Sequence, residues 1–314
     1  MKKILSLCSI LFLLCACGNP KPRLHIYSWA DFFSMELIEQ FEKENNCQII
    51  LDTFDSNESM YAKLKLGSSG YDLIVPSNYF LELMHKQQMI EPVDFTLVPN
   101  FQYFDRRIFK LLSPHMVQYG VPYMLTYSGI AWRRDKLGAI DPSWSIFGSK
   151  EYKGRMTMLN DLREALGAAL RYLGYSVNTI DLNHLQEAKQ LLISWKRQLA
   201  KFESEQYKNG IASGEYLVVQ GYNGDILQVM EENKNVDFTI PSEGMGVSID
   251  FLVIPKGAAN RELAHRFMNF LYNPENAAKN MDFTCFLCPN VAAYGKIKEL
   301  LKLNLLPFLK EEAV

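Results

Sequence analysis

The stretch Leu24-His25-Ile26-Tyr27-Ser28-Trp29 decides how this sequence is interpreted, because it has the aliphatic and aromatic composition of a buried strand. A helical pattern follows it, in which Leu37, Ile38 and Phe41 fall on one face at spacings of three and four residues. Residues 48–54 are rich in branched side chains and indicate a second strand. This order predicts a parallel β-α-β unit whose sheet is covered by helices.

The same alternation of strands and helices continues along the chain. Further strands are predicted over residues 71–75, 127–132, 155–159, 216–220 and 251–255, and further helices over residues 57–66, 79–89, 161–173, 182–200 and 262–272. A chain of 314 residues typically forms about two domains, and no Gly/Ser-rich linker separates them here. We therefore expect an α/β fold of two lobes, each a mainly parallel sheet flanked by helices, joined by strands that cross near residues 123–127 and 249–251.

The predicted lobes are discontinuous in sequence. Residues 24–125 plus 251–291 are assigned to lobe 1 and residues 126–250 to lobe 2, and the lobe of residues 292–314 is left open.

The first 17 residues have the features of a bacterial lipoprotein signal peptide. Lys2 and Lys3 precede an apolar stretch over residues 4–14, which is too short for the ~20 residues that span a bilayer. Leu14-Cys15-Ala16-Cys17 resembles a lipobox, so Cys17 is the predicted lipidation site, with an ordinary signal peptide as the alternative. Residues 18–23 would then be a tether. We expect the protein in the periplasm or on the outer face of the cytoplasmic membrane, held only by its lipid.

Composition and missing motifs argue against several functions. The net charge of −2 provides no basic surface for nucleic acid. The sequence contains no phosphate-binding loop, no complete dinucleotide-binding motif and no nucleophile elbow, and its five histidines lack metalloprotease spacing. We therefore expect no catalytic residues, no cofactor and no enzymatic activity, and we expect a monomer.

The motif Cys285-Phe286-Leu287-Cys288 has the spacing of some redox and metal sites. Its neighbours are apolar, it lies near the C-terminus, and neither a second such motif nor a pair of histidines accompanies it. Buried thiols are the favoured interpretation, a disulfide between the two cysteines is left open, and no metal site is expected.

Aromatic and acidic residues recur near the ends of predicted strands. Ligands of open α/β sheets bind outside the carboxyl ends of the strands. The segments placed there are residues 29–32, 77–79, 161–164 and 222–225, together with Asp250 beside the strand at 251–255. They supply rings, hydroxyls and carboxylates, which favour a cationic ligand over an anion.

These segments resemble the spermidine/putrescine-binding proteins of bacterial ABC importers. The resemblance extends from about Leu24 to Ala293 and is densest over residues 27–32, 56–64, 71–79, 151–155, 161–164, 170–176, 269–271 and 289–293. It implies a two-lobed periplasmic-binding-protein fold of type II, a polyamine ligand and an ABC permease of the inner membrane as partner. It also implies capture of the ligand by closure of the lobes about a hinge.

The resemblance assigns ligand contacts residue by residue. The matching positions are Trp29, Phe32, Ser77, Tyr79, Asp161, Glu164, Tyr222, Asp225, Asp250 and Phe286. Phe32 and Phe286 stand where tyrosine is usual in the family. Tyr222 replaces a tryptophan, and Ser248 stands where a larger aromatic side chain is common. These departures leave the choice between spermidine and putrescine open.

Each assigned residue also has a structural alternative. Asp161 and Glu164 have the spacing of a helix capping box, and Asp225 could cap a helix. Trp29 could be a core aromatic, and Asp250 could pair with a lysine. At the level of function, the alternatives are a polyamine sensor that signals to a membrane receptor and a binding protein for another small cation. An enzyme would need a nucleophile or metal set that the sequence does not display.

Overall fold

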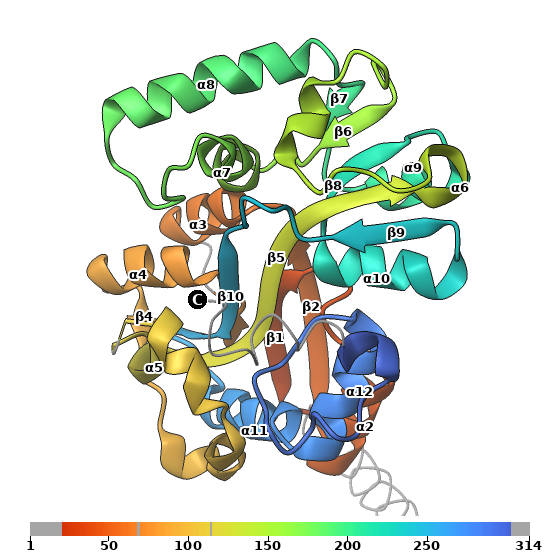
Figure 1. Ribbon diagram of the computed structural model, residues 1–314. Coiled ribbons are helices and arrows are strands. Elements are labelled where there is room, and N and C mark those ends of the chain that lie inside the picture. The colour runs from red at the N-terminus through yellow and green to blue at the C-terminus, as the bar shows by residue number, and fades with distance from the viewer. Residues whose placement is uncertain (1–20, 68–69, 114, 303–314) are drawn as a thin grey trace, which may run out of the picture.

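The computed structural model describes residues 21–67, 70–113 and 115–302. It shows two groups of elements, one above the other, with strands β5 and β10 running between them (Figure 1). The predicted signal peptide, the predicted lipidation site Cys17 and the start of the predicted tether lie outside the described residues, as does the C-terminal end from residue 303. Within the described ranges, no helix is both long enough and apolar enough to cross a membrane.

Lobe 1, the lower group in Figure 1, is built on the predicted β-α-β unit. Its central strand pairs in parallel with a strand on each side. The elements are β1 (Arg23–Trp29), α2 (Met35–Asn45), β2 (Gln48–Phe54), α3 (Asn57–Lys65), β3 (Leu73–Ile74) and α4 (Asn78–Lys86). The carboxyl ends of β1 and β3 therefore meet at one edge, where Trp29 ends β1 and Ser77 follows β3.

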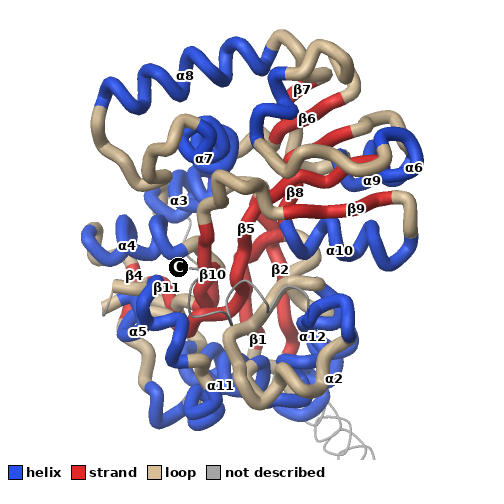
Figure 2. Tube along the Cα trace, in the orientation of Figure 1, coloured by secondary structure: helices blue, strands red, loops and turns tan. Residues whose placement is uncertain are grey.

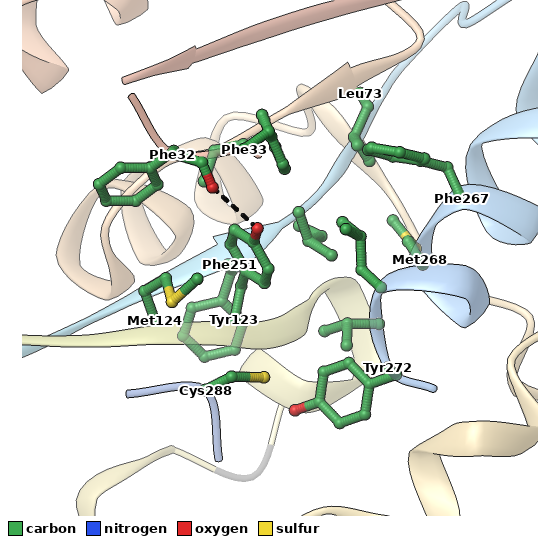
Figure 3. Packing of buried hydrophobic residues seen from close by; sticks show 14 of the residues in the cluster. Phe32, Phe33, Leu73, Tyr123, Met124, Phe251, Phe267, Met268, Tyr272 and Cys288 are labelled. Carbon is green, nitrogen blue, oxygen red and sulfur yellow. Dashed lines mark hydrogen bonds between the residues drawn. The ribbon is translucent and has the colours of Figure 1, made fainter. Parts of the chain in front are cut away.

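The last part of the chain returns to lobe 1 and completes its core. The returning elements are β11 (Ile254–Pro255), α11 (Arg261–Leu271) and α12 (Pro274–Thr284), beside β4 (Ile90–Glu91), α5 (Met116–Tyr119) and the 3-10 turns η1 (Phe95–Leu97), η2 (Pro99–Tyr103) and η3 (Arg106–Leu111). Phe33 and Phe267 pack with ring centroids 5.6 Å apart. The Tyr123 hydroxyl donates a 3.0 Å hydrogen bond to the carbonyl of Phe32 (Figure 3), which fixes the loop after β1 against the core.

Lobe 2, the upper group, contains the second sheet, in the order β10-β5-β8-β6-β7, with β9 also paired to β5. Its own elements are α6 (Arg134–Leu137), η4 (Trp144–Gly148), β6 (Met156–Met158), α7 (Leu162–Tyr172), α8 (Leu182–Lys196), β7 (Lys201–Phe202), α9 (Tyr207–Ser213), β8 (Val218–Tyr222), α10 (Asn223–Glu232) and β9 (Val236–Thr239). Strand β6 pairs in parallel with β7 and β8, while β5 is antiparallel to its partners.

Two antiparallel strands connect the lobes, β5 (Val121–Arg133) and β10 (Val247–Leu252). Leu125 of β5 belongs to the buried core of lobe 1, whereas Ile130 of the same strand belongs to a core of lobe 2. Figure 2 shows these strands as a continuous band between the two groups of helices. The predicted crossing strands are thus observed, while the residue boundaries of the lobes remain a prediction.

The strands at the crossing differ from their predicted bounds. The strand predicted at 127–132 extends over Val121–Arg133, because both lobes bury part of it. The strand predicted at 251–255 is instead β10 followed by β11, so Asp250 lies inside a strand and not before it. The pairing of β10 with β5 shifts register between Asp250 and Phe251. Such an irregularity re-aims a side chain, which periodicity alone does not predict.

Candidate functional site

Asp250 is a buried carboxylate between the lobes, with 3% of its surface exposed. Its two oxygens accept hydrogen bonds from Ser77 Oγ at 2.6 Å and Thr126 Oγ1 at 3.0 Å. Burial raises the pKa of Asp250 to about 6, although these hydrogen bonds oppose the rise. No lysine, arginine or histidine of the described ranges forms an ion pair with it. A carboxylate in this state favours a cation brought by a ligand.

Trp29 ends β1 beside this carboxylate and is half-buried. Its ring packs on Phe54 with centroids 4.5 Å apart and on Phe32 at 6.4 Å. The indole nitrogen opposes the rise in the pKa of Asp250, although it reaches no acceptor at hydrogen-bond geometry within the described structure. Phe54 and Phe32 thus fix the position of the Trp29 ring, and its buried N–H lies near Asp250 without a hydrogen-bond acceptor in the described structure.

Ser77 and Tyr79 are held by Asn57, a residue to which the sequence assigned no role. The amide nitrogen of Asn57 donates to Ser77 Oγ at 3.0 Å and to the Tyr79 hydroxyl at 2.9 Å. Its amide oxygen accepts the backbone N–H of Ser77 at 3.0 Å. Asn57 is buried, and it lies within residues 56–64, one of the segments that carry the family resemblance. That resemblance was the only feature of the sequence that could have drawn attention to it. Asn57 therefore positions Ser77 and Tyr79, the two candidate ligand contacts, through these hydrogen bonds.

The acidic pair of lobe 2 stands at the start of α7. Asp161 caps the helix, since its Oδ1 accepts the backbone N–H groups of Arg163 at 2.8 Å and Glu164 at 3.1 Å. The capping interpretation is therefore confirmed. The other oxygen, Oδ2, accepts the Tyr222 hydroxyl at 3.2 Å. One residue thus has both a structural contact and a contact with the candidate site.

Glu164 does not close the capping box. Its side chain turns toward β5 and accepts a 2.6 Å hydrogen bond from Ser128 Oγ. Burial raises the pKa of Glu164 to about 7, and the hydrogen bond from Ser128 opposes this rise. At neutral pH this carboxyl group is therefore divided between its neutral and charged forms.

The acids of the two lobes are close enough to interact. Burial is the largest cause of the raised pKa of Tyr79, and Asp161 and Asp250 raise it further. Asp250 also raises the pKa of Glu164. The guanidinium of Arg163 lies over the Tyr79 ring, 4.7 Å from its centroid, and thus links α7 to α4. The structure brings together at this place Trp29, Ser77, Tyr79, Asp161, Glu164, Tyr222 and Asp250.

Phe32 and Phe286 lie deeper, with 8% and 6% of their surfaces exposed. Their ring centroids are 5.5 Å apart. The Phe286 ring also covers Gly224, where a Cβ atom would come within 2.6 Å of it. These two side chains pack against each other beside Trp29 and Gly224 and are nearly closed off from solvent.

Cys285 and Cys288, on either side of Phe286 and Leu287, are both buried. Burial raises the pKa of Cys285 to about 12 and also raises that of Cys288, so both thiols resist ionisation. In the described ranges, no group of three or more His, Cys, Asp or Glu side chains is arranged to hold a metal ion.

Asp225 differs from the other acids because it already has a cation. The Tyr207 hydroxyl donates to its Oδ2, and Lys208 Nζ lies 3.4 Å from its Oδ1. The residue lies in the first turn of α10, whose N-cap is Tyr222. Asp225 is therefore not the N-cap of the helix, the structural alternative considered from the sequence, but the partner of Lys208 in an ion pair.

One of two cavities in the structure borders the predicted site residues, and the other does not. A cavity of about 10 Å³, the size of one water molecule, lies beside Glu164 and Ser248, where the family commonly has an aromatic side chain. A wider hollow of about 700 Å³ lies on the outside of lobe 1 among α2, α11 and α12. It contains none of the ten predicted site residues.

Comparison with known proteins places these findings in context. Residues 36–299 match the family model described as bacterial extracellular solute-binding protein. The putrescine-binding periplasmic protein SpuD of Pseudomonas aeruginosa is 34% identical over 89% of this chain and 81% of its own length. The spermidine/putrescine-binding periplasmic protein of Escherichia coli is 34% identical over 86% of this chain and 78% of its own.

Solved structures agree with this fold. A spermidine/putrescine ABC transporter protein from Listeria monocytogenes superposes with a TM-score of 0.87 at 30% identity, over 93% of this chain and 91% of its own. The TpPotD lipoprotein of Treponema pallidum superposes with a TM-score of 0.82 at 37% identity, over 88% of this chain and 90% of its own. The predicted two-lobed fold of type II is confirmed by these structures.

Proposed function

The chain belongs to the bacterial extracellular solute-binding proteins, and on that premise we propose that it captures a polyamine and delivers it to an ABC permease of the inner membrane. The observation that carries the proposal is Asp250, a buried carboxylate with no cationic side chain of the described residues paired to it. A buried charge of this kind is stabilised when a ligand supplies the opposite charge. Relatives along most of the chain are named for putrescine and spermidine binding.

The chemistry of the site suits an amine with apolar spacers. An ammonium group near Asp250 can donate to the carboxylate, and each charged hydrogen bond contributes about 1.5–3 kcal/mol. Trp29 and Tyr222 offer ring faces, over which an ammonium gains about 0.5–2 kcal/mol. The methylenes between the ammonium groups bury apolar area against the same rings. Asp161 and Glu164 then provide acceptors for a second ammonium group on the other lobe.

Closure of the lobes is the proposed capture mechanism. Ser77 follows β3 of lobe 1 and donates to Asp250 of the crossing strand β10, whereas Asp161 and Glu164 stand at the start of α7 in lobe 2. A ligand that bridges both sets favours the closed form through contacts that the open form lacks. The hinge would lie in β5 and β10, the two strands that connect the cores.

The location and assembly follow from the same proposal. We infer a periplasmic protein attached to the membrane by lipid on Cys17, which a relative named as a lipoprotein supports. The protein would act as a monomer, without nucleic acid, cofactor or enzymatic activity, as expected of a carrier that releases its ligand unchanged.

A thermal-shift panel tests the proposal. The full-length chain in mild detergent would be heated with polyamines, amino acids, sugars and metal salts, and positive shifts would be followed by calorimetry. We expect stabilisation by putrescine or spermidine only, because a ligand that binds the folded state alone raises the melting temperature. Stabilisation by an amino acid or a metal salt, with none by polyamines, would reject the ligand class.

A further inference from the structure

Lys208 places a positive charge at one of the predicted cation-binding carboxylates. We propose that its ammonium group is a resident cation that occupies Asp225, shortens the site and so favours a diamine over a longer triamine. The inference rests on the proposed function, since it concerns which polyamine the same site accepts. Nothing in the family resemblance assigned a role to Lys208.

The contacts around Asp225 leave little for a ligand to satisfy. Lys208 Nζ lies 3.4 Å from Oδ1, and the Tyr207 hydroxyl donates to Oδ2. Tyr207 is completely buried and its hydroxyl oxygen also accepts the backbone N–H of Tyr222 at 3.2 Å, so it holds the carboxylate in place. The side chains of Lys208 and Asp225 are only partly exposed, at 28% and 21%. A pair shielded to this degree is screened less than a surface pair.

Tyr222 connects this ion pair to the rest of the site. Its hydroxyl reaches Asp161 at 3.2 Å, while its backbone N–H reaches the Tyr207 hydroxyl that holds Asp225. Asp161 and Asp225 are therefore associated with opposite ends of one tyrosine residue. Phe286 packs directly on Gly224, which lies between Tyr222 and Asp225 in the chain. The first turn of α10 is therefore tightly packed. The ion pair is thus linked to the backbone of Tyr222, whereas Asp161 meets the hydroxyl of the same residue.

The carboxylates of the site therefore fall into two groups, those without an ion pair and Asp225, whose charge is neutralised by Lys208. Asp250, Asp161 and Glu164 form no ion pair with a lysine, arginine or histidine of the described residues, although Arg163 lies close enough to Glu164 to lower its pKa. These three carboxylates can therefore receive ammonium groups. A diamine can bring its two charges to that set. A triamine extends further, and its third ammonium would meet the ammonium of Lys208 or have to displace it. Like charges at such a separation repel, and the repulsion grows where water is partly excluded.

Calorimetry on the full-length chain in detergent tests the inference, with putrescine and spermidine as ligands. In Lys208→Met the affinity for spermidine should rise by about tenfold relative to putrescine, a factor typical of removing one such like-charge contact. Lys208→Arg should keep the wild-type ratio because it keeps the charge. The matched control is Lys279→Met, which removes a lysine of α12 paired at 3.2 Å to Glu36 of α2, on the outside of lobe 1.

A second variant tests whether Asp225 is neutralised by Lys208 or binds the ligand itself. Asp225→Asn leaves Lys208 without its partner and should weaken the binding of both polyamines. Adding Lys208→Met to that variant should restore putrescine affinity to within about threefold of wild type, because the unpaired cation is then gone. If Asp225 instead binds the ligand directly, the double variant will remain as weak as Asp225→Asn.

The outcomes distinguish this inference from the proposed function. A wild-type protein that prefers spermidine, or a ratio that Lys208→Met leaves unchanged, overturns the resident-cation inference while polyamine binding stands. A protein that binds neither polyamine overturns the proposed function itself, and the inference with it. Melting curves of each variant without ligand show whether the fold is retained.

Discussion

Ser77 and Asp250 are 173 positions apart in sequence, yet Ser77 Oγ donates a 2.6 Å hydrogen bond to Asp250 Oδ1 and the two residues form an antiparallel β-bridge. The bridge joins the turn after β3 to the strand that returns from lobe 2. It fixes one wall of the site at the point where the chain passes between lobes.

Replacing Asp250 with Asn should weaken polyamine binding by at least about tenfold, because an ammonium group loses its charged acceptor. The fold should survive, since the amide is isosteric and burying it avoids the cost of a buried charge. Isothermal titration measures the affinity, and a melting curve without ligand checks the fold. An unchanged dissociation constant would remove Asp250 from the site.

Polyamine affinity should fall as the pH is lowered from about 8 to about 5, because protonated Asp250 and Glu164 no longer attract ammonium. Their pKa values, about 6 and about 7, lie in this window. Calorimetry in buffers of different ionisation enthalpy should also show protons released on binding at neutral pH. A pH-independent affinity with no proton release would contradict these ionisations.

The stability of the ligand-free protein should show the opposite trend. In both acids the folded-state pKa is raised above the ordinary value, so the folded state binds the proton more tightly than the unfolded state does. Their contribution is therefore favourable at low pH and is lost as the pH rises through about 6 and 7. Asp250→Asn with Glu164→Gln should flatten this part of the stability curve in chemical denaturation.

Ser128→Ala should move the pH dependence of binding to higher pH. Ser128 donates to Glu164 and opposes the rise in its pKa, so removing the hydroxyl should raise that pKa further. Polyamine affinity measured across the same pH range should then fall at a higher pH than in the wild type. Ser145→Ala, which removes a hydroxyl outside this site, is the control.

Asn57→Ala should lower both stability and affinity, because Ser77 and Tyr79 lose a shared buried partner. A buried polar group left without its hydrogen bond costs about 1–3 kcal/mol, which denaturant unfolding can resolve. The loss of affinity should persist at temperatures well below unfolding, since the two side chains are no longer oriented. A variant that loses stability alone would make Asn57 purely structural.

Sequence patterns were sufficient for the β-α-β unit of lobe 1 and for the two-lobed architecture. Residues 24–29, 37–41 and 48–54 form local patterns of strand and helix, and their order implies parallel pairing whatever the remainder of the chain does. The spacing of Asp161 and Glu164 likewise predicts a helix start, because capping is a contact within one turn. The family resemblance then indicated which strand ends to compare.

Tertiary structure alone decided how the acids differ from one another. Asp225 and Asp250 are the same residue type, yet Asp225 has Lys208 beside it, whereas Asp250 is buried and accepts the hydroxyls of Ser77 and Thr126. That difference depends on neighbours brought from distant parts of the chain, including Thr126 and Ser77, and on a register shift in β10. Charge state follows from burial and from partners in space, so no local pattern in the sequence could have specified it.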